Sequence, residues 1–95
     1  MKKKKYFIID SKDNCATALD YISQDAEVEL INKTIKISDA IPFGHKFAIL
    51  NVKKGSPIIK YGEIIGISTE DINEGDWIHT HNLKSRILSG VLNDG

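Results

Sequence analysis

Glycine and proline residues interrupt the second half of the chain at short intervals. They stand at Pro42, Gly44, Gly55, Pro57, Gly62, Gly66 and Gly75. The segments around and between them are short and rich in β-forming residues, such as 47–52 and 63–68, the second of which contains Gly66. A stable helix needs a longer uninterrupted run, so this spacing favours a compact, mainly β fold of short crossing strands.

The first half of the chain predicts a strand, a helix and a hairpin. Residues 5–10 are rich in β-forming side chains and predict a first strand. Residues 14–22 have apolar side chains at helical spacing, behind a residue that can cap a helix, and predict one short helix. Residues 26–38 alternate apolar and polar side chains, which predicts two half-buried strands joined by a turn at Asn32 and Lys33.

Two segments of the second half share one pattern. Residues 52–58 and 72–78 each read as an apolar residue, two polar residues, a glycine, two variable residues and isoleucine. The glycines of the pattern are Gly55 and Gly75. We expect both to have positive φ in two similar turns that are related by approximate internal symmetry.

The composition is that of an ordinary globular domain and limits the classes of partner. The chain has 95 residues, which is one domain, and a formal net charge of zero, which argues against a nucleic-acid partner. The basic run at 2–5 predicts a solvated terminus. No apolar run is long enough for a membrane span or a secretory signal. A single cysteine, Cys15, cannot form an internal disulfide, and these features together predict a cytoplasmic protein.

Two of the three histidines lie two residues apart, at His79 and His81, and Asn82 follows them. On a strand such residues project from the same face, so both imidazoles could reach one ligand. Three interpretations stay open for the pair: metal ligands, substrate or acid–base groups, and ordinary strand residues. Further ligands would be needed for a metal. Candidates in the chain are His45, Glu70, Asp71 and Asp76. The Asn82 amide would suit a hydroxyl-rich ligand.

Two other groups of polar residues follow turns. Gly44 would let a ligand approach the backbone, and His45 and Lys46 would then suit an anionic or polyhydroxylated substrate. The alternative is an exposed loop. Glu63, next to Tyr61, could be a general base or the polar tip of a hairpin. Phosphate-binding, dinucleotide-binding, CxxC and GxSxG motifs are absent, which excludes the common enzyme classes that use them.

Two segments together resemble the amino-terminal SAF domain of the altronate/galactarate dehydratase family. They read "IPFGHKFAILNVKKGSPIIKYGEIIG" (41–66) and "STEDINEGDWIHTHNLKSR" (68–86). The resemblance divides the chain into a basic segment and first strand at 1–12, an SAF domain at 13–86 and a tail at 87–95. It implies the SAF, or β-clip, fold in a single compact domain.

The same resemblance implies a function. The chain would be a small, non-autonomous subunit of a hydro-lyase that removes water from an aldonate to give a 2-keto-3-deoxy acid. A large subunit would hold most of the catalytic machinery and a divalent metal, iron or manganese. A homo-oligomer is compatible with this arrangement. The alternatives are a non-catalytic sugar-acid-binding or regulatory module, and the small subunit of a sulfolactate sulfo-lyase.

The resemblance also assigns roles to residues. Those expected to be catalytic are His45, His79 and His81, of which His79 and His81 are also the candidate metal ligands. Those expected to bind substrate are Gly44, Lys46, Tyr61, Glu63 and Asn82.

Overall fold

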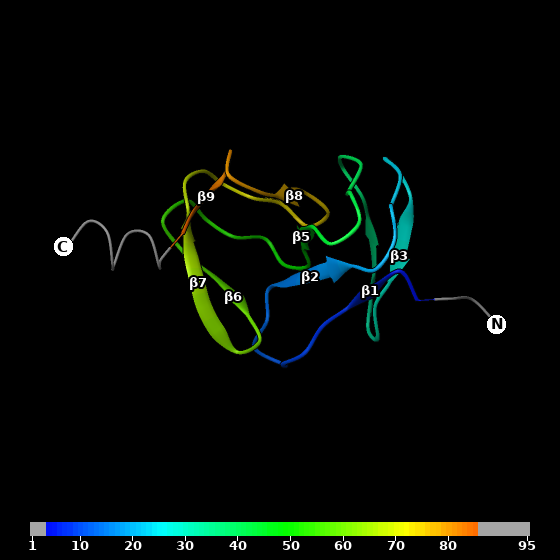
Figure 1. The fold of residues 1–95 in the computed structure, drawn as a ribbon, viewed down its shortest axis with the longest axis horizontal. Helices are drawn as coiled ribbons and strands as arrows, with labels where there is room; N and C mark the ends of the chain where they lie inside the picture. Colours follow the sequence, from blue (N-terminus) through cyan, green and yellow to red (C-terminus); the bar gives the residue numbers. More distant parts are fainter. Residues whose placement is uncertain (1–3, 86–95) are drawn as a thin grey trace.

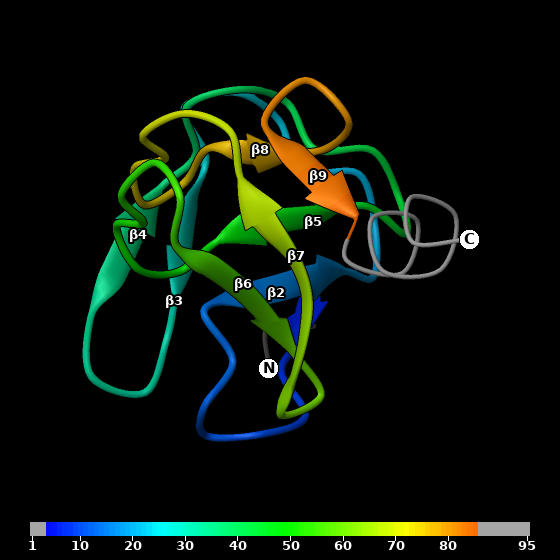
Figure 2. The ribbon, with the colours of Figure 1, turned by 90° about the vertical axis from the view of Figure 1, so that its left-hand side faces the viewer.

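The computed structural model describes residues 4–85, which form short strands in three antiparallel sheets (Figure 1). The strands are β1 (Tyr6–Phe7), β2 (Cys15–Ala18), β3 (Glu27–Glu29), β4 (Thr34–Lys36), β5 (Lys46–Ala48), β6 (Pro57–Lys60), β7 (Glu63–Ser68), β8 (Trp77–Ile78) and β9 (Leu83–Ser85). The central sheet has the order β1-β2-β5-β8. The β3–β4 hairpin lies at one end of the molecule, and the β6-β7-β9 sheet lies at the other, nearest the viewer in Figure 2.

The register of the central sheet separates two sets of side chains. Phe47 on β5 lies opposite Trp77 on β8, while Lys46 lies opposite Ile78 on β8 and Thr17 on β2. Side chains alternate between the faces of a strand, so Phe47 and Trp77 share one face and Lys46 and Ile78 share the other. This division decides on which face of the sheet the candidate site residues described below lie.

Four turns with the same hydrogen bond lie between the sheets. In each turn the N–H of the fourth residue donates to the carbonyl oxygen of the first residue, and the third residue has positive φ. The turns span residues 23–26, 42–45, 53–56 and 73–76. Their third residues are Asp25 (φ 69°), Gly44 (82°), Gly55 (87°) and Gly75 (90°). The expected positive φ at Gly55 and Gly75 is thus confirmed.

The residue that precedes each turn pairs with its counterpart. Ile22 and Ile41 exchange two backbone hydrogen bonds, of 3.0 and 2.8 Å, and Val52 and Ile72 exchange two of 2.7 and 2.8 Å. The turns therefore form two pairs, one at 23–26 and 42–45 and one at 53–56 and 73–76. The sequence pattern revealed only the second pair.

Each pair of turns belongs to its own hydrophobic core. The first core contains Ile22, Ile41 and Phe47, and Trp77 packs against it. The second contains Val52, Ile58, Ile72 and Ile78, together with smaller residues from the central sheet. Two small cores on either side of one sheet explain how strands this short remain folded, because each residue that bridges the turns is buried.

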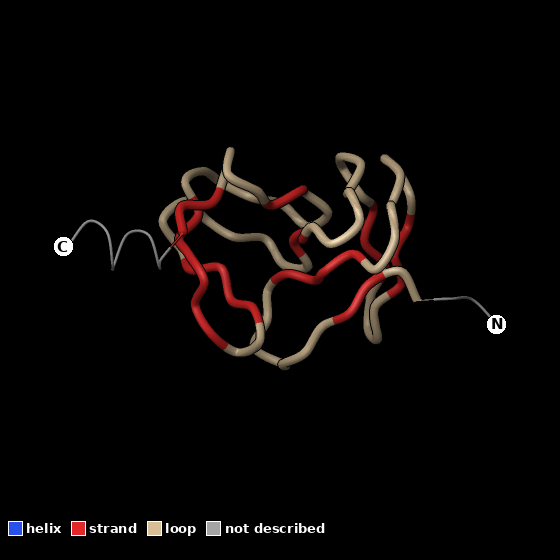
Figure 3. Tube along the Cα trace, in the orientation of Figure 1, coloured by secondary structure: helices blue, strands red, loops and turns tan. Residues whose placement is uncertain are grey.

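The expected helix at 14–22 is wrong, because residues 15–18 form strand β2 at the centre of the sheet. Figure 3 shows strands and loops, without a helix, throughout residues 4–85. The physical reason is burial on both faces: Cys15, Ala16, Thr17 and Ala18 are all buried, so the strand lacks the alternation that would have revealed it. No helix in this part of the chain is long and apolar enough to cross a membrane.

The mainly β architecture and the β3–β4 hairpin are confirmed, with small shifts in position. The first strand covers only Tyr6 and Phe7. The hairpin turn lies at residues 31 and 32, because the N–H of Leu30 donates to the carbonyl of Lys33, so the expected turn at Asn32 and Lys33 is one residue too late. The tail expected at 87–95 lies outside the described residues, as do the first lysines of the basic run.

Candidate functional site

The three histidines of the chain come together around Trp77. The Trp77 ring lies 5.6 Å from the ring of His45, 5.2 Å from that of His79 and 5.4 Å from that of His81, measured between ring centroids. The Trp77 and His79 rings are stacked, with 8° between their planes, and the His45 and His79 rings are 4.9 Å apart. We call these four residues the Trp77 cluster.

Two of the four turns position His45 and Trp77 of the cluster. His45 is the last residue of the 42–45 turn and leads directly into β5, while Trp77 follows the 73–76 turn and begins β8. The pairing of Phe47 with Trp77 brings the two strands side by side. Residues far apart in the sequence therefore meet because both turns end at neighbouring strands of the central sheet.

His79 and His81 reach Trp77 from a turn, and the expectation that they lie on one strand is wrong. Strand β8 ends at Ile78, and the N–H of Asn82 donates to the carbonyl of His79 (3.1 Å). The Asn82 amide closes this turn from inside: its Nδ2 donates to the Trp77 carbonyl (2.8 Å), and its Oδ1 accepts from the His79 N–H (3.0 Å). Asn82 is only 3% exposed. In this structure its amide orients the histidines.

A hydrogen bond from Trp77 fixes the tautomer of His45. The indole Nε1–H can only donate, and it donates to Nδ1 of His45 at 3.2 Å. In the neutral imidazole, the ring proton of His45 must therefore be on Nε2. His45 is half-buried, and its Nε2–H remains available as a donor to a hydroxyl or carboxylate of a ligand.

The residues of the cluster do not fit a complete metal site. Among residues 4–85, no group of three or more histidine, cysteine, aspartate or glutamate side chains is arranged to hold a metal ion. His45 in particular has Nδ1 bonded to Trp77 and a proton on Nε2, so neither nitrogen offers a free lone pair.

The remaining expected site residues are dispersed. Lys46 is half-buried on the face of β5 opposite to Phe47 and Trp77, because side chains alternate along the strand. Tyr61 has positive φ (58°) in the β6–β7 turn and stacks on Phe7, and Glu63 is exposed at the start of β7. Gly44 is exposed beside His45, with open space where a side chain would be. The structure thus joins Gly44 to the Trp77 cluster and separates Lys46, Tyr61 and Glu63 from it.

Two residues that the sequence pattern did not single out stabilise the histidine cluster and the β6–β7 turn. Trp77 is the only tryptophan of the chain and stands two residues before His79, which was the available signal.

Asp13 is 4% exposed and accepts backbone hydrogen bonds from Ile9, Asp10 and Gly62. Burial alone would raise the pKa of Asp13, but these bonds outweigh it, and the pKa lies below its ordinary value of 3.8. Asp13 thereby ties the β6–β7 turn to the loop after β1.

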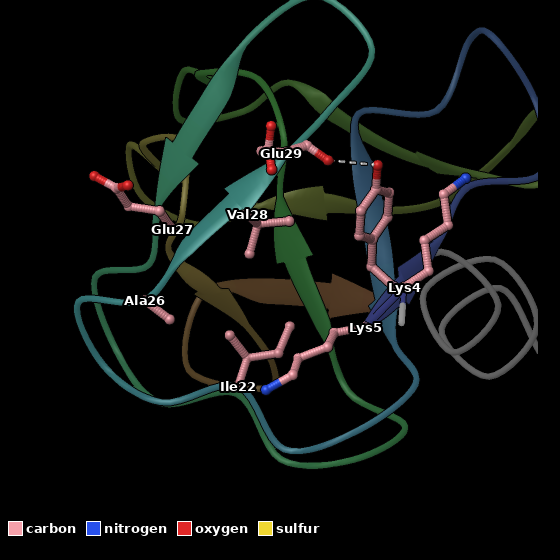
Figure 4. Close-up of a pocket in the computed structure, with 8 residues that line it drawn as sticks. Lys4, Lys5, Ile22, Ala26, Glu27, Val28 and Glu29 are labelled. Atoms are coloured by element: carbon pink, nitrogen blue, oxygen red, sulfur yellow. Dashed lines mark hydrogen bonds between the residues drawn. The ribbon is translucent and has the colours of Figure 1, made fainter. Parts of the chain in front are cut away.

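A separate cavity of about 380 Å³ lies between β1 and β3 (Figure 4). Its apolar lining includes Ile22, Ala26 and Val28. Tyr6 also lines it and donates a hydrogen bond to the carbonyl of Glu29 (2.9 Å). None of the expected site residues lines it.

The all-β module with paired turns and a histidine cluster corresponds to a known class of domain. Residues 4–86 match the SAF domain of altronate/galactarate dehydratases, and the chain belongs to this family. It is 36% identical over 83 residues to the altronate dehydratase of Escherichia coli (strain K12), and 34% identical over 84 residues to that of Bacillus subtilis (strain 168). These alignments cover 87% and 88% of the chain but only 17% of each relative.

A smaller relative is also similar. The chain is 46% identical over 46 residues to the (2R)-sulfolactate sulfo-lyase subunit alpha of Paracoccus pantotrophus. That alignment covers 48% of this chain and 69% of the subunit. The relatives of this chain therefore include both large dehydratases, of which it matches a small part, and a short subunit of a lyase.

Proposed function

We propose that this chain is the SAF module of a sugar-acid lyase and works with a larger polypeptide that completes the active site. The observation that carries the proposal is the Trp77 cluster, which gathers every histidine of a chain that belongs to a dehydratase domain family. The small share of the dehydratases that the chain matches supports a role for a second polypeptide or further domain. We place the complex in the cytoplasm and the fold among the β-clips, which the crossing paired turns favour.

The proposed reaction removes water from an aldonate. A base takes the proton from C2, an acid protonates the hydroxyl that leaves C3 as water, and the resulting enol tautomerises to the 2-keto-3-deoxy acid. Imidazoles can accept or donate a proton near neutral pH, which suits either step. In our proposal His45 uses its Nε2–H to contact a substrate hydroxyl, and His79 and His81 contact substrate or transfer a proton at its edge.

Among the residues expected to bind substrate, the structure favours Gly44 over Lys46, Tyr61 and Glu63. Gly44 leaves open space beside His45, so a ligand can approach the backbone there. Lys46, Tyr61 and Glu63 lie away from the cluster and would contact a substrate only at a second place. Iron or manganese, if the complex uses it, would be held mainly by the partner, and no step proposed for this chain runs through a metal.

A sulfolactate sulfo-lyase is the second candidate function. The observation in its favour is that the chain matches more than two-thirds of one short subunit alpha, in contrast to 17% of the altronate dehydratases. In that reaction the leaving group would be sulfite in place of water. A binding module without chemistry is the remaining alternative.

The experiment is a pull-down with the tagged chain from extract of its own organism, in the absence of oxygen. The eluate is supplied with Fe²⁺ or Mn²⁺ and assayed for 2-keto-3-deoxy acid from D-altronate and galactarate, and for sulfite from sulfolactate. We expect a large co-purifying polypeptide and product from a sugar acid, with the small chain inactive alone. Sulfite as the only product would establish the second candidate, and an inactive eluate that binds sugar acid would establish the binding module.

A further inference from the structure

A second group of polar side chains lies on the face of the central sheet opposite to the Trp77 cluster. Lys46 on β5 lies opposite Thr17 on β2, and Thr17 lies opposite Phe7 on β1. Residues paired across an antiparallel sheet share a face, with Cβ atoms about 5 Å apart. Phe7, Thr17 and Lys46 therefore form a row across three strands.

The β6–β7 hairpin brings a second lysine to this row. The Phe7 ring stacks on Tyr61 at 6.3 Å, and Nζ of Lys60 lies 4.9 Å from the centre of the Tyr61 ring. Sγ of Cys15, which lies on the same face of β2 as Thr17, is 3.5 Å from the carbonyl oxygen of Ile59, the residue before Lys60. These contacts pack the hairpin that carries Lys60 against the same face of the central sheet as Lys46.

The two lysines lack an acidic partner within residues 4–85. The ion pairs there join Lys33 to Glu74 and Lys36 to Asp25. Burial, and then the charge of Lys60, lower the pKa of Lys46, and burial raises the pKa of Cys15 to about 11, so the thiol stays neutral. Two half-buried cations that repel each other and form no ion pair are unfavourable, and a bound anion would relieve both the burial and the repulsion.

A hydroxyl group is also available beside them. Thr17 is 9% exposed, and its hydroxyl makes none of the hydrogen bonds found in the described part of the chain. No polar side-chain atom there is both buried and unpaired, so the hydroxyl retains access from outside. Two ammonium groups and one hydroxyl are suitable donors for the oxygens of a carboxylate, sulfate or sulfonate.

We propose that Lys46, Lys60 and Thr17 form a binding site for a small oxyanion, separate from the Trp77 cluster and on the other face of β5. The site depends on the geometry of the sheet and the β6–β7 hairpin, and it stands whether or not the chain is part of a lyase. Asp13 accepts a hydrogen bond from the Gly62 N–H (2.8 Å) and so holds the turn that carries Tyr61.

The test is an NMR titration of the ¹⁵N-labelled chain with sodium sulfate and, separately, with sodium acetate, with ionic strength held constant by sodium chloride. We expect saturable shifts of the Thr17, Lys46 and Lys60 amides. Lys60→Gln and Lys46→Gln should each weaken sulfate binding by about tenfold or more, the loss of one charge-assisted contact. Thr17→Val should weaken it by a smaller factor.

Lys53→Gln is the matched control, because Lys53 is exposed at the 53–56 turn, away from the row. It removes the same charge and should leave the affinity unchanged. Shifts that stay linear in sulfate concentration would overturn the proposal, and so would an equal loss of affinity in Lys53→Gln and Lys60→Gln. The amide spectrum of each variant reports whether it is folded, so a folded Lys60→Gln with wild-type affinity would also contradict it.

Discussion

The four turns have the same hydrogen bond, but one of them lies in different surroundings from the other three. In the first pair, Asp25 and Gly44 are exposed, and a side chain at Gly44 would meet open space. In the second pair, Gly55 is also exposed and surrounded by open space, whereas Gly75 is buried, and a Cβ there would lie 2.1 Å from the carbonyl oxygen of Lys36. The comparison teaches that one turn geometry is held by local backbone preference in one place and by packing in another.

The same comparison separates scaffold from function. One turn of each pair leads to the Trp77 cluster: 42–45 ends at His45, and 73–76 precedes Trp77. The other two turns lead to β3 and β6, which carry no member of the cluster. The four turns therefore determine where the strands begin. The residues at the end of each turn or directly after it determine whether that region contributes to the Trp77 cluster.

Of the substitutions that test this comparison, Gly75→Ala should cause the largest loss of stability. Its Cβ would clash with backbone, and alanine is strained at a φ of 90°, so we expect a loss of about 3 kcal/mol or more in the free energy of unfolding. Urea denaturation measures it. Gly44→Ala is the control: it has the strain without the clash and should cost about 1–2 kcal/mol. Equal losses in the two variants would show that packing does not distinguish the Gly75 turn from the Gly44 turn.

Asn82→Ala should have the next largest effect. It removes both hydrogen bonds that close the turn after β8 and leaves the Trp77 carbonyl unpaired, which costs about 2 kcal/mol. The control is Asn51→Ala, because Asn51 also accepts a backbone hydrogen bond, from Glu74, but is exposed. We expect Asn82→Ala alone to move the NMR signals of the His79 and His81 rings. Unchanged ring signals would contradict the orienting role of Asn82.

Asp13→Asn should destabilise the chain in a pH-dependent way. The folded-state pKa of Asp13 is depressed, so its contribution is present above the unfolded value near 3.8 and is lost as the pH falls through the folded value. At pH 7 the variant should lose about 1–2 kcal/mol, and below pH 3 the difference should shrink. Denaturation at both pH values tests this, with exposed Asp20→Asn as the control. A loss that does not depend on pH would count against an ionised Asp13 as the anchor.

Asp25→Gly should have the smallest effect. Glycine relieves the strain of positive φ but adds freedom to the unfolded chain, and the exposed Lys36–Asp25 ion pair (3.9 Å) contributes little. We expect a change within about 0.5 kcal/mol in either direction. A large loss, seen in the same urea denaturation, would mean that the first pair of turns also depends on specific side-chain contacts.

The mainly β class of the fold and one of the two pairs of turns could be predicted from the sequence. Gly55 and Gly75 marked the second pair of turns because glycine stood at the same place in both. The first pair escaped notice because Asp25 takes the position of glycine in one turn. Asparagine and aspartate tolerate positive φ better than most residues, so a search for glycine alone misses such a turn. The helix expected at 14–22 failed because a strand buried on both faces has no alternation.

The sequence drew attention to the histidines but did not predict how they come together. His79 and His81 do approach one group, Trp77, but from a turn, since Asn82 ends the strand early. The meeting of His45 with them depends on the pairing of β5 with β8, which spans residues far apart in the sequence and has no local signature. The separation of Lys46 from Trp77 has the same origin, because side chains alternate along β5 and Phe47, not Lys46, pairs with Trp77.

The most direct test of the functional account is the kcat of the complete complex with His79→Ala in this chain, compared with Thr80→Ala in the same exposed turn. If the Trp77 cluster takes part in proton transfer, kcat should fall by about 10²–10⁴-fold in His79→Ala, with assembly unchanged, and stay near the wild-type value in Thr80→Ala. An unchanged kcat in His79→Ala, with only KM or the assembly of the complex affected, would contradict the account and leave this chain as a binding module.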